Sequence, residues 1–229
     1  MEDEEIGYPS FLPLFRSPPE RGSPPYLAFL NITSSAPAAL RGVVAALGRS
    51  PSPGDEIRAL LDDLDWRAHL VGGMALIASL RRDGPALDAL WRAFDEGSWV
   101  SPQLAAIASI LDPRFADQAR ERILRRCQGV PDRSSDAGML LRHTASGPNS
   151  FYHRECKALA ALIAAARCLP ELRVWAEEQG REPDARRMLR ADPDRGGAIV
   201  SYWRPLCIGL CQDVIGELRR ELARRRAAN

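Results

Sequence analysis

The sequence has little lysine, little histidine and almost no net charge. Lys157 is the only lysine among 31 basic residues, and three histidines occur in 229 residues. Because 30 acidic residues bring the formal net charge to +1, the chain as a whole has no strong attraction for nucleic acid. The longest apolar helix that we expect, from about Leu70 to Leu80, is much shorter than the about 20 residues that span a bilayer. We therefore expect no membrane partner.

The sequence also lacks the features of a secreted protein. Residues 2–5 are all acidic, whereas a secretory signal has positive charge ahead of an apolar stretch. The five cysteines are an odd number and lie within expected helices, which is more typical of reduced thiols than of a disulfide framework. These features favour a cytoplasmic protein.

No catalytic motif is present. The histidines are His69, His143 and His153, and no serine lies in a Gly-x-Ser-x-Gly turn that could form a triad with one of them. Phosphate-binding loops of the Walker A type and the Gly-x-Gly-x-x-Gly pattern are also missing. The sequence therefore predicts no catalytic residues and no cofactor, and it favours a protein that is not an enzyme.

Four residues have the spacing of metal ligands on helices. His153 and Cys156 are three positions apart, and Cys207 and Cys211 are four apart, so each pair would point to one side of its helix. Both cysteine-bearing segments are apolar, however, and isolated cysteines are among the most buried residues in proteins. We predict no metal site. Cys156, Cys207 and Cys211 have two interpretations, as thiols of the core or as zinc ligands.

The hydrophobic pattern from Ala36 onward is helical. Leu87, Leu90, Trp91 and Phe94 follow the spacing of one buried helix face, and no segment alternates as a strand does. The sequence therefore predicts an all-α protein.

The distribution of proline and glycine divides the chain into regions. Residues 1–25 contain six prolines, and we expect an extended or disordered N-terminal segment there. Residues 26–229 should form a single all-helical domain. Long loops are expected near 129–150 and 180–204, which are rich in Gly, Pro and charged residues.

The chain contains an internal repeat. Trp66 opens a segment that includes the apolar run 75–80, and Trp99 opens another that includes the similar run 105–110. The tryptophans are 33 positions apart (99 − 66) and the runs are 30 apart (105 − 75). A third copy is plausible at 161–165. Such units are helical hairpins that bury their apolar faces by stacking on one another.

This pattern resembles the HEAT-like repeats across roughly residues 55–180. The resemblance implies antiparallel helical hairpins stacked as a short solenoid, and the alternative is an irregular α-helical bundle. It also implies a non-catalytic protein-binding module, such as an adaptor or a scaffold. The small size of the chain adds an immunity or accessory protein as a further form of this role. Some HEAT-like proteins are DNA glycosylases, so the second hypothesis is a nucleic-acid-binding protein or an enzyme of that type.

Two tryptophans and a basic cluster are the candidate binding residues. Trp99 and Trp203 lie at expected turn edges, where an indole can remain exposed to anchor a partner. The cluster consists of Arg186, Arg187 and Arg190, which could contact an acidic partner or phosphate. The favoured partner is another protein of unknown identity, and nucleic acid is the less favoured one.

The expected last helix, residues 205–226, has an apolar seam. Its intervals are those of a coiled coil: Ile208, Cys211, Ile215, Leu218 and Leu222. We favour a closing helix that packs on its own chain, and the alternative is a homodimer through this helix.

Overall fold

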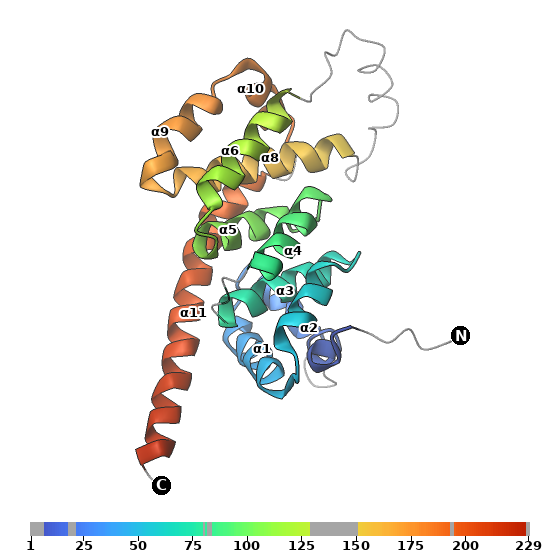
Figure 1. The fold of residues 1–229 in the computed structure, drawn as a ribbon, viewed down its shortest axis with the longest axis vertical. Helices are drawn as coiled ribbons and strands as arrows, with labels where there is room; N and C mark the ends of the chain where they lie inside the picture. Colours follow the sequence, from blue (N-terminus) through green and yellow to red (C-terminus); the bar gives the residue numbers. More distant parts are fainter. Residues whose placement is uncertain are drawn as a thin grey trace, which may run out of the picture. The chain divides into compact units, whose positions relative to one another are not determined.

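The computed structural model describes residues 7–17, 22–79, 81, 84–128, 151–192 and 195–227. These residues form helices and turns, with no strand among them, so the predicted all-α class is confirmed (Figure 1). The sequence analysis expected one helical domain. The chain divides into two compact units, Met1–Arg92 with Trp203–Asn229, and Ala93–Tyr202.

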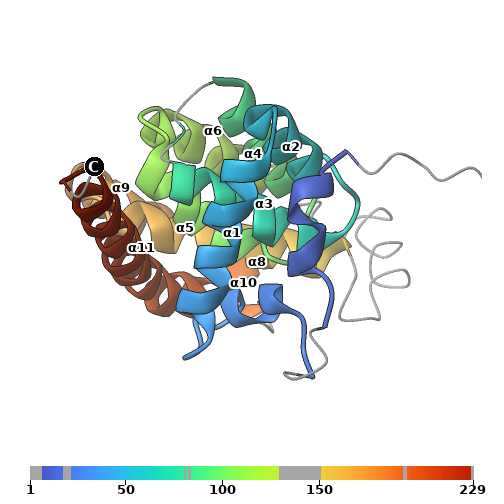
Figure 2. The same cartoon turned by 90° about the horizontal axis from the view of Figure 1, so that it is seen from below.

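The first unit is built around α3 (Trp66–Ser79), whose residues from Ala68 to Ile77 are all buried. This helix contacts α1 (Ala36–Arg49), α2 (Pro53–Leu61) and the 3-10 helix η2 (Pro25–Phe29), and Figure 2 shows α1, α2 and α3 side by side. The unit also includes most of α4 (Gly84–Asp95) and the later part of α11 (Gly196–Ala227).

The N-terminal segment is more ordered than the sequence predicted. A 3-10 helix, η1 (Pro9–Leu14), packs on α1 and buries Phe11 and Leu14. Tyr8 donates a hydrogen bond to Asp63 at 2.7 Å. The expectation of an extended or disordered segment is therefore wrong for residues 7–17, because a proline at the first helical position loses no hydrogen bond. Residues 1–6 and 18–21 lie outside the described residues.

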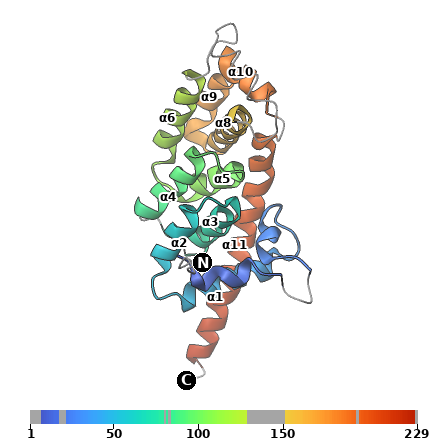
Figure 3. The ribbon, with the colours of Figure 1, turned by 90° about the vertical axis from the view of Figure 1, so that its right-hand side faces the viewer.

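The second unit is organised around α8 (Phe151–Arg167), which contacts α5, α6, α9 and α10 (Figure 3). Their bounds are Ser101–Leu111, Phe115–Gln128, Pro170–Gln179 and Pro183–Arg190. The repeated apolar runs of the sequence fall in α3, α5 and α8. Small residues in these runs are buried, as Ala75, Ala105 and Ala161 illustrate. The small alanine side chain leaves room for a neighbouring helix at these positions.

The prediction of a long loop at residues 180–204 is wrong. Helix α10 covers Pro183–Arg190, and α11 begins at Gly196 instead of at Pro205, which lies inside the helix. Asp192 accepts a hydrogen bond of 2.5 Å from the backbone N–H of Gly196 and so satisfies a donor in the first turn of α11. Pro183 and Gly196 are the first residues of these two helices, although the Gly, Pro and charge content of 180–204 predicted a long loop. The other predicted loop, 129–150, lies outside the described residues.

Candidate protein-binding surface around Trp99

The two candidate tryptophans have opposite environments. Trp99 is 47% exposed, whereas Trp203 is completely buried and donates a 2.7 Å hydrogen bond from Nε1 to the carbonyl oxygen of Phe29. The prediction that Trp203 is exposed is therefore wrong, because the residue lies within α11 and not at a turn. Trp203 belongs to the core of the first unit.

The three candidate arginines lie on α10 of the second unit. Arg186 and Arg190 are exposed, and the half-buried Arg187 pairs with Asp184 one turn earlier. Ala185 and Met188 are buried on the same helix. Helix α10 packs on α6 and α8. Trp99 and these arginines are thus in the same unit, and Trp203 is not.

A tight turn holds Trp99 in place at the end of α4. Gly97 has a φ of +81°, its N–H bonds the carbonyl of Phe94 at 3.2 Å, and the N–H of Ser98 bonds the carbonyl of Ala93 at 3.2 Å. This is the Schellman motif, in which glycine adopts the left-handed conformation without a steric penalty. The carbonyl of Ser98 then accepts the N–H of Ser101 in the first turn of α5. The backbone on both sides of Trp99 is therefore fixed.

The only lysine of the chain lies against the Trp99 ring. Lys157 on α8 places its Nζ 4.7 Å from the ring centroid, a cation–π distance, although the whole residue is only 5% exposed. Gly196 packs on the backbone of the same residue, because a Cβ atom at Gly196 would lie 2.6 Å from the Lys157 carbonyl oxygen. Packing therefore restricts Lys157, and its ammonium group lies over one face of the Trp99 indole.

A second cluster of charges ties α6 to the end of α4. Asp95 accepts contacts from Arg122 at 2.7 Å, Arg125 at 3.0 Å and Arg126 at 3.3 Å. Arg126 also reaches Glu155 on α8 at 3.0 Å. The side chains of Arg122 and Arg126 are only 10% and 4% exposed. These two arginines are structural cross-links and do not form a free basic face.

The cluster has an excess of positive charge. Three guanidinium groups face the carboxylates of Asp95 and Glu155, and the buried Nη1 of Arg126 has no hydrogen-bond partner among the described residues. Arg154 adds another exposed cation and packs beside Gly97, since a Cβ atom there would meet its Cδ at 3.4 Å. Arg125 and Arg154 are thus exposed cations next to the Trp99 turn, and the exposed Glu96 is an anion of the same turn.

The sequence analysis missed Lys157 and Asp95 as parts of this surface. A weak signal existed for Lys157, since it is the only lysine and lies within an apolar segment. Asp95 follows the buried face of α4 directly, and Arg122, Arg125 and Arg126 have the spacing of one helix side. Which of these charges meet one another depends on the packing of α4, α6 and α8, and that packing is not visible in the sequence.

Three of the five cysteines lie within the helix packing. Cys156 and Cys207 are completely buried and Cys211 nearly so. A hydrogen bond between the thiols of Cys207 and Cys211, reinforced by burial, raises the pKa of Cys207, and the same hydrogen bond lowers the pKa of Cys211. In the part of the chain that the structure describes, no group of three or more His, Cys, Asp or Glu residues could hold a metal ion.

The seam proposed for a homodimer is partly used within the chain. Cys211 is buried, as are its neighbours Leu210 and Val214 on α11. Arg41 on α1 pairs with Glu217, which also holds α11 to its own unit. The side chains of Ile215, Leu218 and Leu222 lie outside the described residues.

Among the described helices, none combines the length and the apolar character that crossing a membrane requires. No family model, no curated protein and no solved structure matches the chain.

Proposed function

We propose that the chain is a non-catalytic protein-binding module in which Trp99 anchors the partner. The observation that supports this most is an indole 47% exposed on a rigid turn, with Lys157 against its ring. Aromatic anchors of this kind supply much of the free energy of protein association. Because the turn is already ordered, little conformational entropy would be lost when a partner binds.

The charges around Trp99 favour a partner with acidic residues. Arg125 and Arg154 are exposed, and the Asp95 cluster has more guanidinium groups than carboxylates. An apolar side chain of the partner would pack on the indole, with carboxylates at the rim meeting the arginines. Rim charges of this kind mainly speed association and select the partner.

The wider role that we propose is that of an adaptor, scaffold or accessory protein in the cytoplasm. It rests on the HEAT-like sequence repeat and on the location of the repeated runs in the buried helices α3, α5 and α8. A stack of such hairpins would hold the Trp99 turn as part of a larger binding surface.

The test is a pull-down from the cells that express the chain, with and without nuclease, read by mass spectrometry. We expect a stoichiometric protein partner that survives nuclease and moderate salt, and that Trp99→Ala loses. Tyr202→Ala is the matched control, because Tyr202 is an exposed aromatic residue (59%) of the same unit on α11. With purified partner, Trp99→Ala should weaken binding by about thirtyfold, the effect of a hot spot of about 2 kcal/mol. If the Trp99→Ala and Tyr202→Ala variants recover the partner equally, Trp99 is not part of the interface.

Nucleic acid remains the second candidate. The exposed Arg186 and Arg190 on α10 favour it, whereas the burial of Arg122 and Arg126 in contacts with Asp95 weakens it. Recovery that collapses with nuclease would support it. A labelled oligonucleotide should then bind with strong salt dependence, and Arg186→Gln should weaken that binding at low salt.

A further inference from the structure

Residues 7–17 of the first unit lie on α1 and α2 without sharing backbone hydrogen bonds with them. The backbone–backbone hydrogen bonds of this N-terminal segment are local, such as those from Phe11 to Tyr8 at 3.1 Å and from Phe15 to Leu12 at 3.0 Å. Among the described residues, none joins the segment to another part of the chain. The segment can therefore leave the surface and keep these bonds, as segments of low local stability at chain ends do.

Two apolar side chains anchor the N-terminal segment. Phe11 and Leu14 are three positions apart and are buried, whereas the other residues of η1 are half-buried or exposed. Leu14 packs closely on α1, since a Cβ atom at Gly42 would lie 3.1 Å from the leucine Cδ2. The other end lies close to α2, because a Cβ atom at Gly7 would lie 2.9 Å from the Cβ of Ala59. The segment thus contacts the helices as a short bound peptide with two apolar anchors does.

The serine before the first anchor binds a buried carboxylate. Ser10 donates two hydrogen bonds to Glu56, from its backbone N–H at 2.9 Å and from its hydroxyl at 2.8 Å. Glu56 is only 5% exposed, and the hydroxyl of Ser50 donates to the same carboxylate at 2.6 Å. When the N-terminal segment leaves, Glu56 loses both bonds from Ser10. Water or another segment must then replace them, and a segment that offers the same N–H and hydroxyl restores both.

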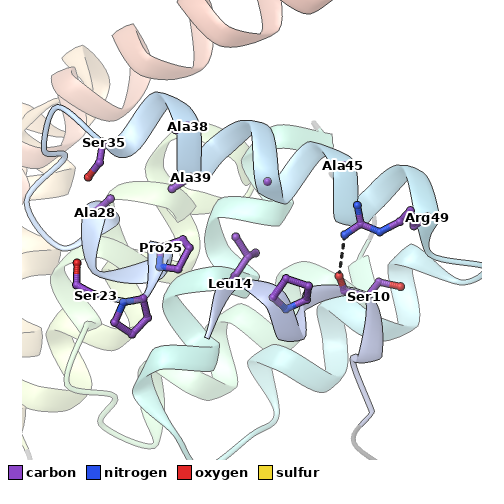
Figure 4. A pocket seen from close by; sticks show the side chains of 13 residues that line it. Ser10, Leu14, Ser23, Pro25, Ala28, Ser35, Ala38, Ala39, Ala45 and Arg49 are labelled. Carbon is purple, nitrogen blue, oxygen red and sulfur yellow. Dashed lines mark hydrogen bonds between the residues drawn. The ribbon is translucent and has the colours of Figure 1, made fainter. Parts of the chain in front are cut away.

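The N-terminal segment does not fill the space beside it. A cavity of about 520 Å³ lies between η1, η2 and α1, and Ser10 and Leu14 line it together with Ala38 and Ala45 of α1 (Figure 4). Side chains along such a space lose packing contacts. Arg49, at the end of α1, adds only a long hydrogen bond of 3.4 Å to the Ser10 carbonyl oxygen (Figure 4). The segment is therefore held less firmly than a core helix.

We propose that this surface of α1 and α2 is a peptide-binding site, which residues 7–17 occupy as an autoinhibitory segment. The partner that fits it is a protein segment with the pattern Ser-Phe-x-x-Leu, which supplies the two donors for Glu56 and the two apolar anchors. Such a partner binds only when the N-terminal segment leaves, so its apparent affinity is reduced by the fraction of molecules with a free site. The site belongs to the first unit and is independent of Trp99, which belongs to the second.

The experiment measures, by fluorescence anisotropy, how the full chain binds a synthetic peptide with the sequence of residues 7–16, labelled at its C-terminal end. Phe11→Ala in the chain weakens its own segment and leaves α1 and α2 unaltered. The peptide should therefore bind this variant about tenfold more tightly than the unaltered chain. A peptide with alanine in place of its serine should bind the same variant about tenfold more weakly than the parent peptide, because it lacks the hydroxyl that Glu56 accepts.

The matched control is Arg16→Ala, which changes an exposed residue of the same segment and should bind the peptide as the unaltered chain does. Ser10→Ala in the chain is a second, milder variant, for use if circular dichroism shows that Phe11→Ala disturbs folding. It should bind the peptide about threefold more tightly than the control, because it loses one of the two bonds to Glu56. The proposal is overturned if the folded variants bind the peptide no better than Arg16→Ala, or if the peptide without serine binds as tightly as the parent peptide.

Discussion

The indole N–H of Trp203 donates a 2.7 Å hydrogen bond to the backbone carbonyl of Phe29, across 174 positions of the chain. Both residues are completely buried. The bond attaches α11 to η2 and supplies a partner for a backbone carbonyl at the end of a short helix. It therefore joins two segments of the first unit that are far apart in sequence.

The first prediction concerns this bond. Trp203→Phe keeps an aromatic ring but removes the donor, so the Phe29 carbonyl stays buried without it and a small void opens. We expect the free energy of unfolding to fall by about 1–3 kcal/mol. Urea denaturation followed by circular dichroism would measure it. The control Trp99→Phe, at an exposed site, should change stability by less than about 0.5 kcal/mol. Equal losses in the two variants would contradict this assignment.

The second prediction concerns the charge cluster of the second unit. Asp95→Ala leaves Arg122 and Arg126 nearly buried without their shared carboxylate. We expect a loss of about 3 kcal/mol, the usual cost of removing one partner from a buried ion pair. Asp62→Ala is the comparison, because Asp62 pairs with the exposed Arg92. It should cost less than about 1 kcal/mol. If both substitutions cost the same in thermal and urea denaturation, the Asp95 cluster is not a structural cross-link.

The third prediction compares two glycines of α11. A Cβ atom at Gly196 would lie 2.6 Å from the Lys157 carbonyl oxygen, whereas a Cβ atom at Gly209 meets no atom within 4 Å. Gly196→Ala should therefore destabilise the chain by about 1–3 kcal/mol, as overpacking does. Gly209→Ala should stabilise it by up to about 1 kcal/mol, because alanine favours the helix. Differential scanning calorimetry of both variants would check the opposite signs.

The fourth prediction is a dependence on alkaline pH. Burial, followed by the hydrogen bond to Asp63 and the charges of Asp63 and Asp65, raises the pKa of Tyr8 above its ordinary value of about 10. Above about pH 10 the folded chain thus keeps the Tyr8 proton, whereas the unfolded chain loses it. The stability that the protonated Tyr8 gives to the folded chain is therefore complete below about pH 10 and declines as the pH rises further. Urea denaturation between pH 8 and pH 11, with reductant present, should show a steeper decline for the unaltered chain than for Tyr8→Phe. Parallel declines would mean that Tyr8 does not cause the effect.

Much of the fold could be predicted from local patterns. The Leu87, Leu90, Trp91 and Phe94 spacing predicted the helix that is now α4, and all four side chains are buried. The repeated apolar runs predicted helices that the structure confirms as α3, α5 and α8. These signals work because side chains three and four positions apart share one helix face.

Other features depended on contacts that no local pattern contains. The prediction took Pro205 as a helix start and so placed Trp203 at a turn, although α11 begins at Gly196 and its tryptophan meets a carbonyl 174 residues earlier. Trp99 was correctly expected to be exposed, but its lysine neighbour comes from α8, 58 positions later (157 − 99). Phe11 and Leu14 are buried because they pack on α1. The many prolines around them predicted an extended segment instead, since composition does not show which surface a segment packs on.

The first unit is discontinuous in sequence, and this has a consequence for the order of events during synthesis. Residues 1–92 leave the ribosome well before residues 203–229, which complete the same unit. At about 5–20 residues per second, the 174 positions between Phe29 and Trp203 take roughly 9–35 seconds to translate. All residues of the second unit are translated within that interval. The carbonyl of Phe29 therefore has no Trp203 to bind throughout that time, and a chaperone would have access to the uncovered segment until α11 is made.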